Sequence, residues 1–313
     1  MNIPMTISGV LLGLFCVACG VDDRSTATLD QMNQGGSSAG DGARAMTLTI
    51  EAGNGATGLD PGAEFGGVAD GWTVRYDKLL VAIGDVKEGS GSAPESLADD
   101  TAYLVDLRQL PAGGVSMASN AHSLMSFEDA EFSTLIATDS AVLVLASEAD
   151  RELMVKGGYS IYIEGSITRA GGRSCRPEAP TDCSSAPMIV FSWGLAAAAN
   201  FSGCHAFTLS GDTAELTLTL PGDPWFLGKF AVDAEHSPRR AQWIADADLD
   251  RDGETTLDEL RAIKAELLFS PERGYDLRNV AVPVETAHDF LAAQVRTIGI
   301  NSANGCGLGT PLD

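Results

Sequence analysis

The stretch Tyr159-Ser160-Ile161-Tyr162-Ile163-Glu164-Gly165-Ser166-Ile167 decides the fold class of this 313-residue chain. Apolar and polar residues alternate along most of it, as they do in a β-strand that buries one face. Alternating segments or short apolar runs recur on both sides, and clusters of Gly, Pro, Asn, Asp and Ser separate them. These segments lie at residues 47–50, 72–76, 103–107, 141–145, 188–191 and 214–220.

Many short strands without intervening helices predict a mainly β protein, with a β-sandwich domain over residues 46–230. Residues 79–86 are a candidate for a further strand. Residues 123–137 are ambiguous, and we interpret them as partly helical. The pattern predicts no strand order.

The pattern changes after Phe230, and residues 231–313 are expected to form a small helical region. Ser237 as N-cap and Pro238 as first helical residue predict the start of its first helix. Apolar residues recur at helical spacing from Leu257 to Leu267 and again within residues 285–295. Because this region has few large apolar groups, we expect it to pack on the sandwich rather than to fold alone.

Between the first two predicted helices lies the acidic loop Asp248-Leu249-Asp250-Arg251-Asp252-Gly253-Glu254-Thr255-Thr256-Leu257-Asp258-Glu259. A hard divalent cation binds about six to eight oxygen atoms, which alternate residues of a tightly wound loop supply. Gly253 stands where such a loop turns sharply with positive φ. The predicted Ca²⁺ ligands are the side chains of Asp248, Asp250 and Asp252, the carbonyl of Glu254, Thr256 directly or through water, and bidentate Glu259.

This loop resembles the calcium loop of the EF-hand family, and the resemblance covers residues 237–269. Position 8 of the loop is Thr255, whereas the family usually has Ile, Leu or Val there, pairing with a second loop. The sequence has no second such run, so the resemblance implies a lone hand that packs on the rest of the protein and binds a structural ion. The alternative is an acidic surface turn, whose seven carboxylates from Asp246 to Glu259 would repel one another without a cation.

Residues 1–19 have the features of an export signal, since residues 7–18 are almost wholly apolar but short for a membrane span. The segment Cys16-Val17-Ala18-Cys19-Gly20 resembles the lipobox of bacterial lipoproteins. The resemblance implies a lipid on Cys19 and a place in the cell envelope, with Gly20 favouring the outer membrane. An ordinary signal peptide cut nearby is the alternative. Residues 20–45 are polar and rich in Gly and Ser, which predicts a flexible linker.

Four further cysteines, an even number, predict two disulfides in an oxidising compartment. Cys175 and Cys183 flank a proline-containing loop and are expected to close it. Cys204 and Cys306 would then attach the C-terminal tail to the β-rich body. The alternative is a metal site at Cys204-His205, although no C-x-x-C spacing accompanies it.

The formal charge of −23, from 43 acidic and 20 basic residues, argues against nucleic-acid binding and against electrostatic docking on anionic lipid. The sequence has no Gly-x-Ser-x-Gly elbow, no His-Glu-x-x-His pair and no Gly-rich phosphate loop, so we expect a protein that is not an enzyme. Trp72, Trp193 and Trp225 are either exposed platforms for sugars or core residues, and a β-rich chain favours the core.

The wider chain also resembles a group of uncharacterised bacterial lipoproteins that join a β-sandwich to a lone EF-hand and a C-terminal helix ending in a cysteine. The matching features are Cys19, residues 157–165, residues 248–259 and residues 290–306. The predicted function is therefore an exported, membrane-anchored calcium-binding lipoprotein whose ion stabilises the fold, with a protein or glycan ligand left open. The alternative function is a secreted hydrolase or metal-handling protein whose site is assembled from distant residues.

Overall fold

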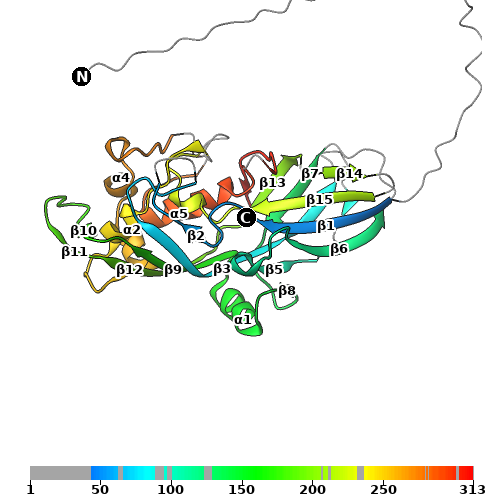
Figure 1. The fold of residues 1–313 in the computed structure, drawn as a ribbon, viewed down its shortest axis with the longest axis horizontal. Helices are drawn as coiled ribbons and strands as arrows, with labels where there is room; N and C mark the ends of the chain where they lie inside the picture. Colours follow the sequence, from blue (N-terminus) through cyan, green and yellow to red (C-terminus); the bar gives the residue numbers. More distant parts are fainter. Residues whose placement is uncertain are drawn as a thin grey trace, which may run out of the picture. The chain divides into compact units, whose positions relative to one another are not determined.

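The structure, a computed structural model, describes residues 44–62, 66–88, 95–96, 101–122, 129–205, 207–210, 213–230, 236–278, 280, 282–300 and 303–312. Residues Gly42–Asp313 cluster as one compact unit. Its described part is mainly β, with most of the helices gathered toward one end (Figure 1). The predicted export signal, Cys19 and nearly all of the predicted linker lie outside the described residues.

The strands and helices follow one another along the chain with short connections. The strands are β1 (Arg44–Ala52), β2 (Gly58–Leu59), β3 (Thr73–Glu88), β4 (Glu95–Ser96), β5 (Tyr103–Asp106), β6 (Val115–His122), β7 (Ala130–Thr134), β8 (Val142–Val144), β9 (Ile161–Thr168), β10 (Arg173–Cys175), β11 (Cys183–Ser185), β12 (Met188–Leu195), β13 (Ala199–Cys204), β14 (Phe207–Ser210), β15 (Thr213–Leu220), β16 (Glu254–Thr255) and β17 (Thr310–Pro311). The helices are α1 (Glu148–Gly157), α2 (Gln242–Ala247), α3 (Leu257–Ala262), α4 (Ala265–Leu268) and α5 (Ala287–Gln294), with the short turns η1 (Leu107–Gln109), η2 (Pro224–Phe226), η4 (Pro271–Arg273) and η5 (Val295–Thr297).

The described strands form two larger sheets and one hairpin. The smaller sheet has the order β14-β15-β1-β6, in which β1 runs parallel to β15 and antiparallel to β6. The larger, mixed sheet has the order β16-β12-β9-β3-β7-β13-β17, with β2, β4 and β5 also paired to β3 and β8 paired to β5. Strands β10 and β11 form the separate hairpin. Apolar residues of both sheets, such as Leu48 and Phe132, belong to one buried core.

Strand β9, the stretch quoted first, lies between β3 and β12 in the larger sheet. Its alternating residues Ile161, Ile163 and Ile167 are fully buried, which confirms the predicted period of two. Gly165 is needed here because a Cβ atom at this position would collide with the carbonyl of Arg75 on the neighbouring strand. The register of β3 shifts between Tyr76 and Lys78, and across this irregularity the two strands predicted at 72–76 and 79–86 become one.

The helical region shares its core with one end of the larger sheet through a series of aromatic contacts. Trp193 of β12 stacks on Trp243 of α2 with ring centroids 5.4 Å apart. Trp243 meets the ring of Phe269 edge-on at 5.6 Å, and Phe269 stacks on Phe290 of α5 at 3.7 Å. Aromatic pairs add to the stabilisation that burial of their area provides. The tryptophans predicted as either platforms or core residues, Trp72, Trp193 and Trp225, are fully buried, so the core interpretation is confirmed.

Two sequence predictions about the first helices of this region are wrong. Helix α2 begins at Gln242 rather than at Ser237-Pro238, because the N–H groups of Ala241 and Gln242 donate to the Asp70 carboxylate at 2.9 and 2.8 Å. The second helix is divided into α3 and α4. Residues 263–264 between them are extended and bond to the segment before α5, since Ala287 N–H donates to the Ile263 carbonyl at 2.9 Å.

Two further differences lie in the β-rich part. Residues 130–134 form strand β7 in the middle of the larger sheet, so the expectation of partial helix is wrong there, and residues 123–128 lie outside the described part. Helix α1 was not expected. Ser147 and Asp150 form a capping box at its start. Met154 is the one apolar residue of α1 that is fully buried, so the apolar residues of this segment give only a weak helical period in the sequence. Among the described residues, no helix is long and apolar enough to cross a membrane.

Candidate metal centre

The acidic loop lies between the end of α2 and the start of α3, and it brings three of the predicted ligands together. Asp248, Asp250 and Asp252 each offer a carboxylate oxygen, and these oxygens lie within 4.8 Å of one another. Asp248 is buried, whereas Asp250 and Asp252 are exposed. The cluster is therefore accessible from solvent on one side, as a site for a hard cation requires.

Hydrogen bonds inside the loop hold the aspartates in place. The Asp248 carboxylate accepts from the N–H groups of Asp252 and Gly253, both at 3.1 Å. Asp252 accepts from the N–H of Glu254 at 2.8 Å. Gly253 has a φ of 92°, a conformation that strains residues with a Cβ atom, so its predicted role in the turn is confirmed.

Glu259 reaches back into the loop from the first turn of α3. Its Oε1 accepts from the N–H of Leu249 at 2.7 Å, and its Oε2 accepts from the N–H of Thr256 at 2.8 Å. Thr256 is the N-cap of α3, and its hydroxyl lies 2.9 Å from Glu259 Oε2 in a capping box. The structure therefore turns both residues toward the loop, although the Glu259 oxygens are outside the three-aspartate group.

The loop is attached to the larger sheet through its own short strand, β16. Glu254 and Thr255 pair in parallel with Val190 and Phe191 of β12. Thr255 is fully buried; its hydroxyl donates to the Ile244 carbonyl at 2.7 Å, and its carbonyl accepts from the Trp193 indole at 2.7 Å. Position 8 of the loop thus pairs with a strand of the body. The sequence predicts that the loop packs on the body, but nothing in it identifies β12 as the partner.

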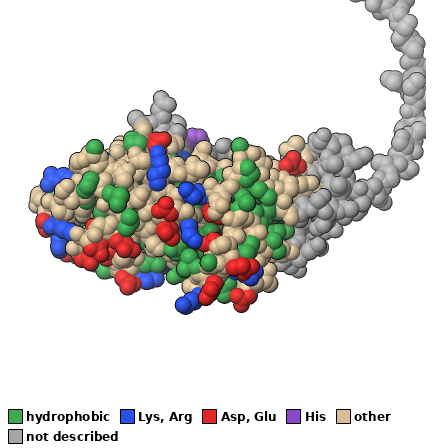
Figure 2. Space-filling model, turned by 60° about the horizontal axis from the view of Figure 1, so that its bottom comes forward, with side chains coloured by type: hydrophobic (Ala, Val, Ile, Leu, Met, Phe, Trp, Pro, Cys, Tyr) green, Lys and Arg blue, Asp and Glu red, His purple; other side chains and the backbone are tan. Residues whose placement is uncertain are grey.

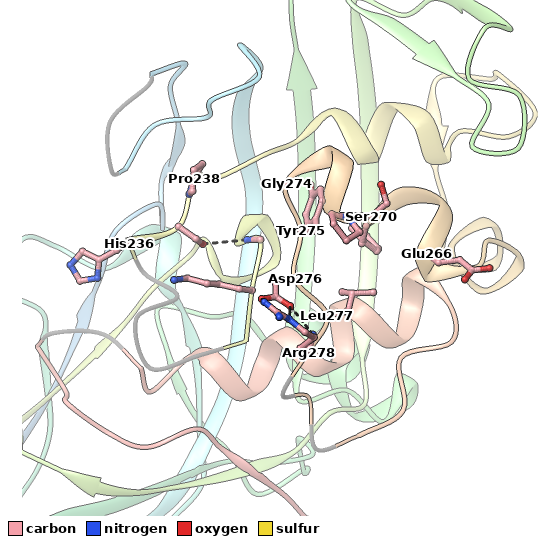
Figure 3. Close-up of a pocket in the computed structure, with 14 residues that line it drawn as sticks. His236, Pro238, Glu266, Ser270, Gly274, Tyr275, Asp276, Leu277 and Arg278 are labelled. Atoms are coloured by element: carbon pink, nitrogen blue, oxygen red, sulfur yellow. Dashed lines mark hydrogen bonds and ion pairs between the residues drawn. The ribbon is translucent and has the colours of Figure 1, made fainter.

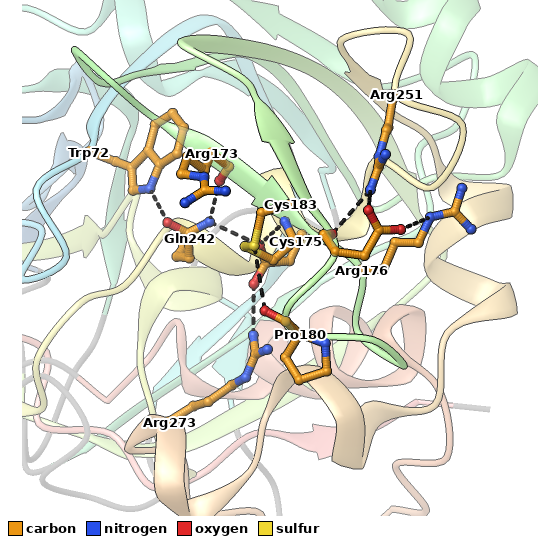
Figure 4. Close-up of a disulfide and its surroundings, with 11 residues drawn as sticks. Trp72, Arg173, Cys175, Arg176, Pro180, Cys183, Gln242, Arg251 and Arg273 are labelled. Atoms are coloured by element: carbon orange, nitrogen blue, oxygen red, sulfur yellow. Dashed lines mark hydrogen bonds and ion pairs between the residues drawn. A yellow bond between two sulfur atoms is a disulfide. The ribbon is translucent and has the colours of Figure 1, made fainter.

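The electrostatics of the loop disfavour the ionised form of Asp248 in the absence of a cation. Burial raises the pKa of Asp248, and the nearby charges of Glu259 and Asp252 raise it further. Hydrogen bonds from the backbone N–H groups of Gly253 and Arg251 act in the opposite direction and lower it. A divalent cation among these carboxylates would favour their ionised forms. The loop's one arginine, Arg251, is directed elsewhere, since its Nη2 lies 2.8 Å from the carboxylate of Asp182 (Figure 4).

The Cys175–Cys183 disulfide closes the β10–β11 hairpin beside the loop, as predicted. Asp246, two residues before the loop, ties this hairpin to the helical region. Its carboxylate accepts from the N–H of Cys175 at 2.9 Å and from Gln242 Nε2 at 2.9 Å, and it pairs with Arg273 at 2.8 Å. The Asp246 side chain is only 4% exposed. Nothing in the sequence distinguishes this inward-facing carboxylate from the acidic residues around it, and the sequence analysis missed it.

The second disulfide joins Cys204 of β13 to Cys306 in the C-terminal tail, and this pairing was also predicted. Both cysteines are buried. The side chain of Asn304 anchors the same tail to β15, because it bonds the N–H and the carbonyl of Thr219, both at 2.8 Å. The alternative metal site at Cys204-His205 is wrong, since the sulfur of Cys204 is in the disulfide and His205 lies 2.9 Å from the Asp129 carboxylate.

A pocket of about 910 Å³ lies beside η4 and contains titratable side chains. Figure 3 shows its His236 and Glu266 at opposite ends. The Asp276 carboxylate is held by the Arg278 guanidinium at 2.7 Å, which lowers the pKa of Asp276 to about 2. The hydrogen bonds of Arg278 thus occupy the carboxylate between these ends, and His236 and Glu266 do not converge.

The chain was compared with known proteins in three ways. No protein-family model, no curated protein and no solved structure matches it. Its function is therefore argued from the loop and its surroundings.

Proposed function

We propose that this chain is an exported calcium-binding protein with a β-sandwich body and a single EF-hand, and that it is not an enzyme. Ca²⁺ would bind in the loop at residues 248–259 and stabilise the fold. A lipid on Cys19 would hold the protein at the cell envelope, with the predicted linker between the lipid and the folded body. The observation that carries the calcium proposal is the convergence of three aspartate oxygens within 4.8 Å.

The donor set fits calcium better than it fits a softer metal. The candidate ligands are carboxylate, hydroxyl and carbonyl oxygens, which Ca²⁺ and Mg²⁺ prefer, whereas Zn²⁺ and Cu²⁺ favour nitrogen and sulfur. Mg²⁺ requires near-ideal octahedral geometry and loses water reluctantly, so a loop that offers up to seven oxygens favours Ca²⁺. We expect a Kd of about 10⁻⁴–10⁻³ M, the range of extracellular modules.

A structural ion agrees with the way the loop is attached. A sensor hand exposes a groove when its helices move apart. Here β16 is part of the larger sheet, and Thr255 bonds both Ile244 and Trp193 within the core. Opening the hand would break these buried bonds, so the ion is proposed to fix the junction between the sheet and the helical region.

Calcium is expected to raise the Tm of the protein through mass action. Free Ca²⁺ at about 100 times Kd adds about 2.7 kcal/mol to the free energy of unfolding. This corresponds to a rise of roughly 5–10 °C, given about 2–4 °C per kcal/mol for a domain of this size class. The measurement is a thermal melt at increasing CaCl₂, with MgCl₂ at equal ionic strength as the control. A Tm that responds equally to both salts, or to neither, would count against a calcium-specific structural site.

A further inference from the structure

A second pocket, about 480 Å³ in volume, lies where the turn between β9 and β10, the start of α2 and η4 come together. Its lining contains four arginines and two aspartates, in a chain with only 20 basic residues and a formal charge of −23. Acidic and basic side chains are interspersed on the face of the molecule in Figure 2. The arginines are Arg169, Arg173, Arg240 and Arg273.

Two of these arginines have guanidinium groups that form no ion pair or hydrogen bond among the described residues, although the charge of Arg169 acts on the nearby Asp70 carboxylate. Arg169 and Arg173 come from the two ends of the β9–β10 turn, where Gly172 N–H donates to the Arg169 carbonyl at 2.9 Å. The backbone of Arg173 is fixed as well, because its carbonyl accepts from Gln242 Nε2 at 2.7 Å (Figure 4). Neither guanidinium forms an ion pair or a hydrogen bond with another side chain or carbonyl in the described residues. Both side chains are exposed and available to a ligand.

The other two arginines and the two aspartates are already engaged. Arg240 lies over the ring of Tyr275 at 5.8 Å from its centroid, and Arg273 is paired with Asp246. Asp70 accepts the N–H groups of Ala241 and Gln242 before α2; burial raises its pKa, against these hydrogen bonds and the charge of Arg169, which lower it. With four arginines and two aspartates in its lining, the pocket keeps an excess of positive charge when both aspartates are ionised.

We propose that this pocket binds a small molecule that carries a carboxylate or phosphate group. Guanidinium groups bind such oxyanions through paired, charge-assisted hydrogen bonds, and Arg169 and Arg173 would provide them. The volume lies within the range of about 300–1,000 Å³ that is usual for small-molecule sites. Trp243, Leu268 and Tyr275, which are buried in the core, form the floor of the pocket. The proposal does not depend on calcium.

The test is a binding titration of the folded unit Gly42–Asp313 with three probes: D-glucuronate, its neutral analogue D-glucose, and inorganic phosphate. Calorimetry and ligand-observed NMR both suit weak affinities. The double variant Arg169→Gln/Arg173→Gln removes the unpaired guanidinium groups. Arg108→Gln/Arg261→Gln is the matched control, because it makes the same change in charge at two exposed positions outside the pocket. A thermal melt of each variant confirms that it is folded.

We expect at least one anion to bind saturably and glucose not to bind. The affinity should fall about tenfold or more in Arg169→Gln/Arg173→Gln and stay within about twofold of the parent protein in the control. Binding of glucuronate alone identifies a carboxylate site, and binding of phosphate alone identifies a phosphoryl site. The proposal is overturned if neither anion binds, if glucose binds as well as glucuronate, or if both double variants lose affinity equally.

Discussion

Replacing Glu259 with glutamine is expected to weaken calcium binding about tenfold or more and to remove most of the calcium-dependent rise in Tm. The substitution removes one negative charge and one of two oxygens from the residue that would close the coordination shell. Glutamine serves in a capping box as well as glutamate does, so its amide oxygen can keep the hydrogen bonds to Thr256 at the start of α3. Its amide nitrogen cannot accept from the N–H of Leu249, so that bond is lost. A thermal melt without calcium measures the cost of the lost bond, and the change in the calcium-dependent rise in Tm then reports on the ion. Calorimetric titration with CaCl₂ measures the loss of affinity.

The matched control is Asp258→Asn, which removes a carboxylate from the neighbouring position. Asp258 is 95% exposed at its side chain and pairs only with Arg261 among the described residues, at 3.0 Å. It takes no part in the aspartate cluster. We expect its affinity for calcium to stay within about threefold of the parent protein, since only long-range charge is lost. Equal losses in the two variants would mean that the loop attracts cations through its net charge rather than through a defined shell.

Removing the Cys204–Cys306 disulfide is expected to cost about 2–5 kcal/mol of the free energy of unfolding. The bond spans a sequence separation of 102 residues, so its loss frees a long loop in the unfolded chain. It also holds the tail in which Asn304 bonds β15 and Thr310 pairs with β13. The measurement is urea unfolding of Cys204→Ala/Cys306→Ala, with the midpoint and the slope both recorded.

The Cys175–Cys183 disulfide is the internal reference for that measurement. Cys175 and Cys183 are separated by only 8 residues, for which the same loop-closure argument gives roughly 2.5 kcal/mol. Cys175→Ala/Cys183→Ala should therefore destabilise the protein less than Cys204→Ala/Cys306→Ala. The opposite order would show that the hairpin beside the acidic loop contributes more to the folded state than the attachment of the tail does.

Much of the β-rich part was predictable from the sequence because its signal is local. Alternation in residues 159–167 predicts one buried face, and the fully buried Ile161 and Ile163 confirm it. Both cysteine pairs were also predictable, from an even count and the positions of the cysteines along the chain. The order of the strands was not predictable from local patterns, because the parallel pairing of β1 with β15 joins segments more than a hundred residues apart.

Several of the failures have a common physical cause, which is that groups distant in sequence decided local structure. Asp70 determines where α2 begins by accepting two N–H groups from residues more than 170 positions later in the chain. The segment before α5 bonds residues 263–264 and divides a helix that the apolar spacing predicts as continuous. The pairing of β16 with β12 likewise joins segments that are distant in sequence. The grouping of Asp248, Asp250 and Asp252 was predictable, because their spacing in the loop carries the whole signal.

The most direct test of the calcium proposal is an isothermal titration of the unit Gly42–Asp313 with CaCl₂, after removal of divalent ions. The proposal predicts one saturable site per chain, with a Kd of about 10⁻⁴–10⁻³ M, that is lost or strongly weakened in Glu259→Gln. A titration without saturable heat, or with several equivalent weak sites that survive Glu259→Gln, would contradict it. The loop would then be an acidic turn on the surface of a β-rich protein.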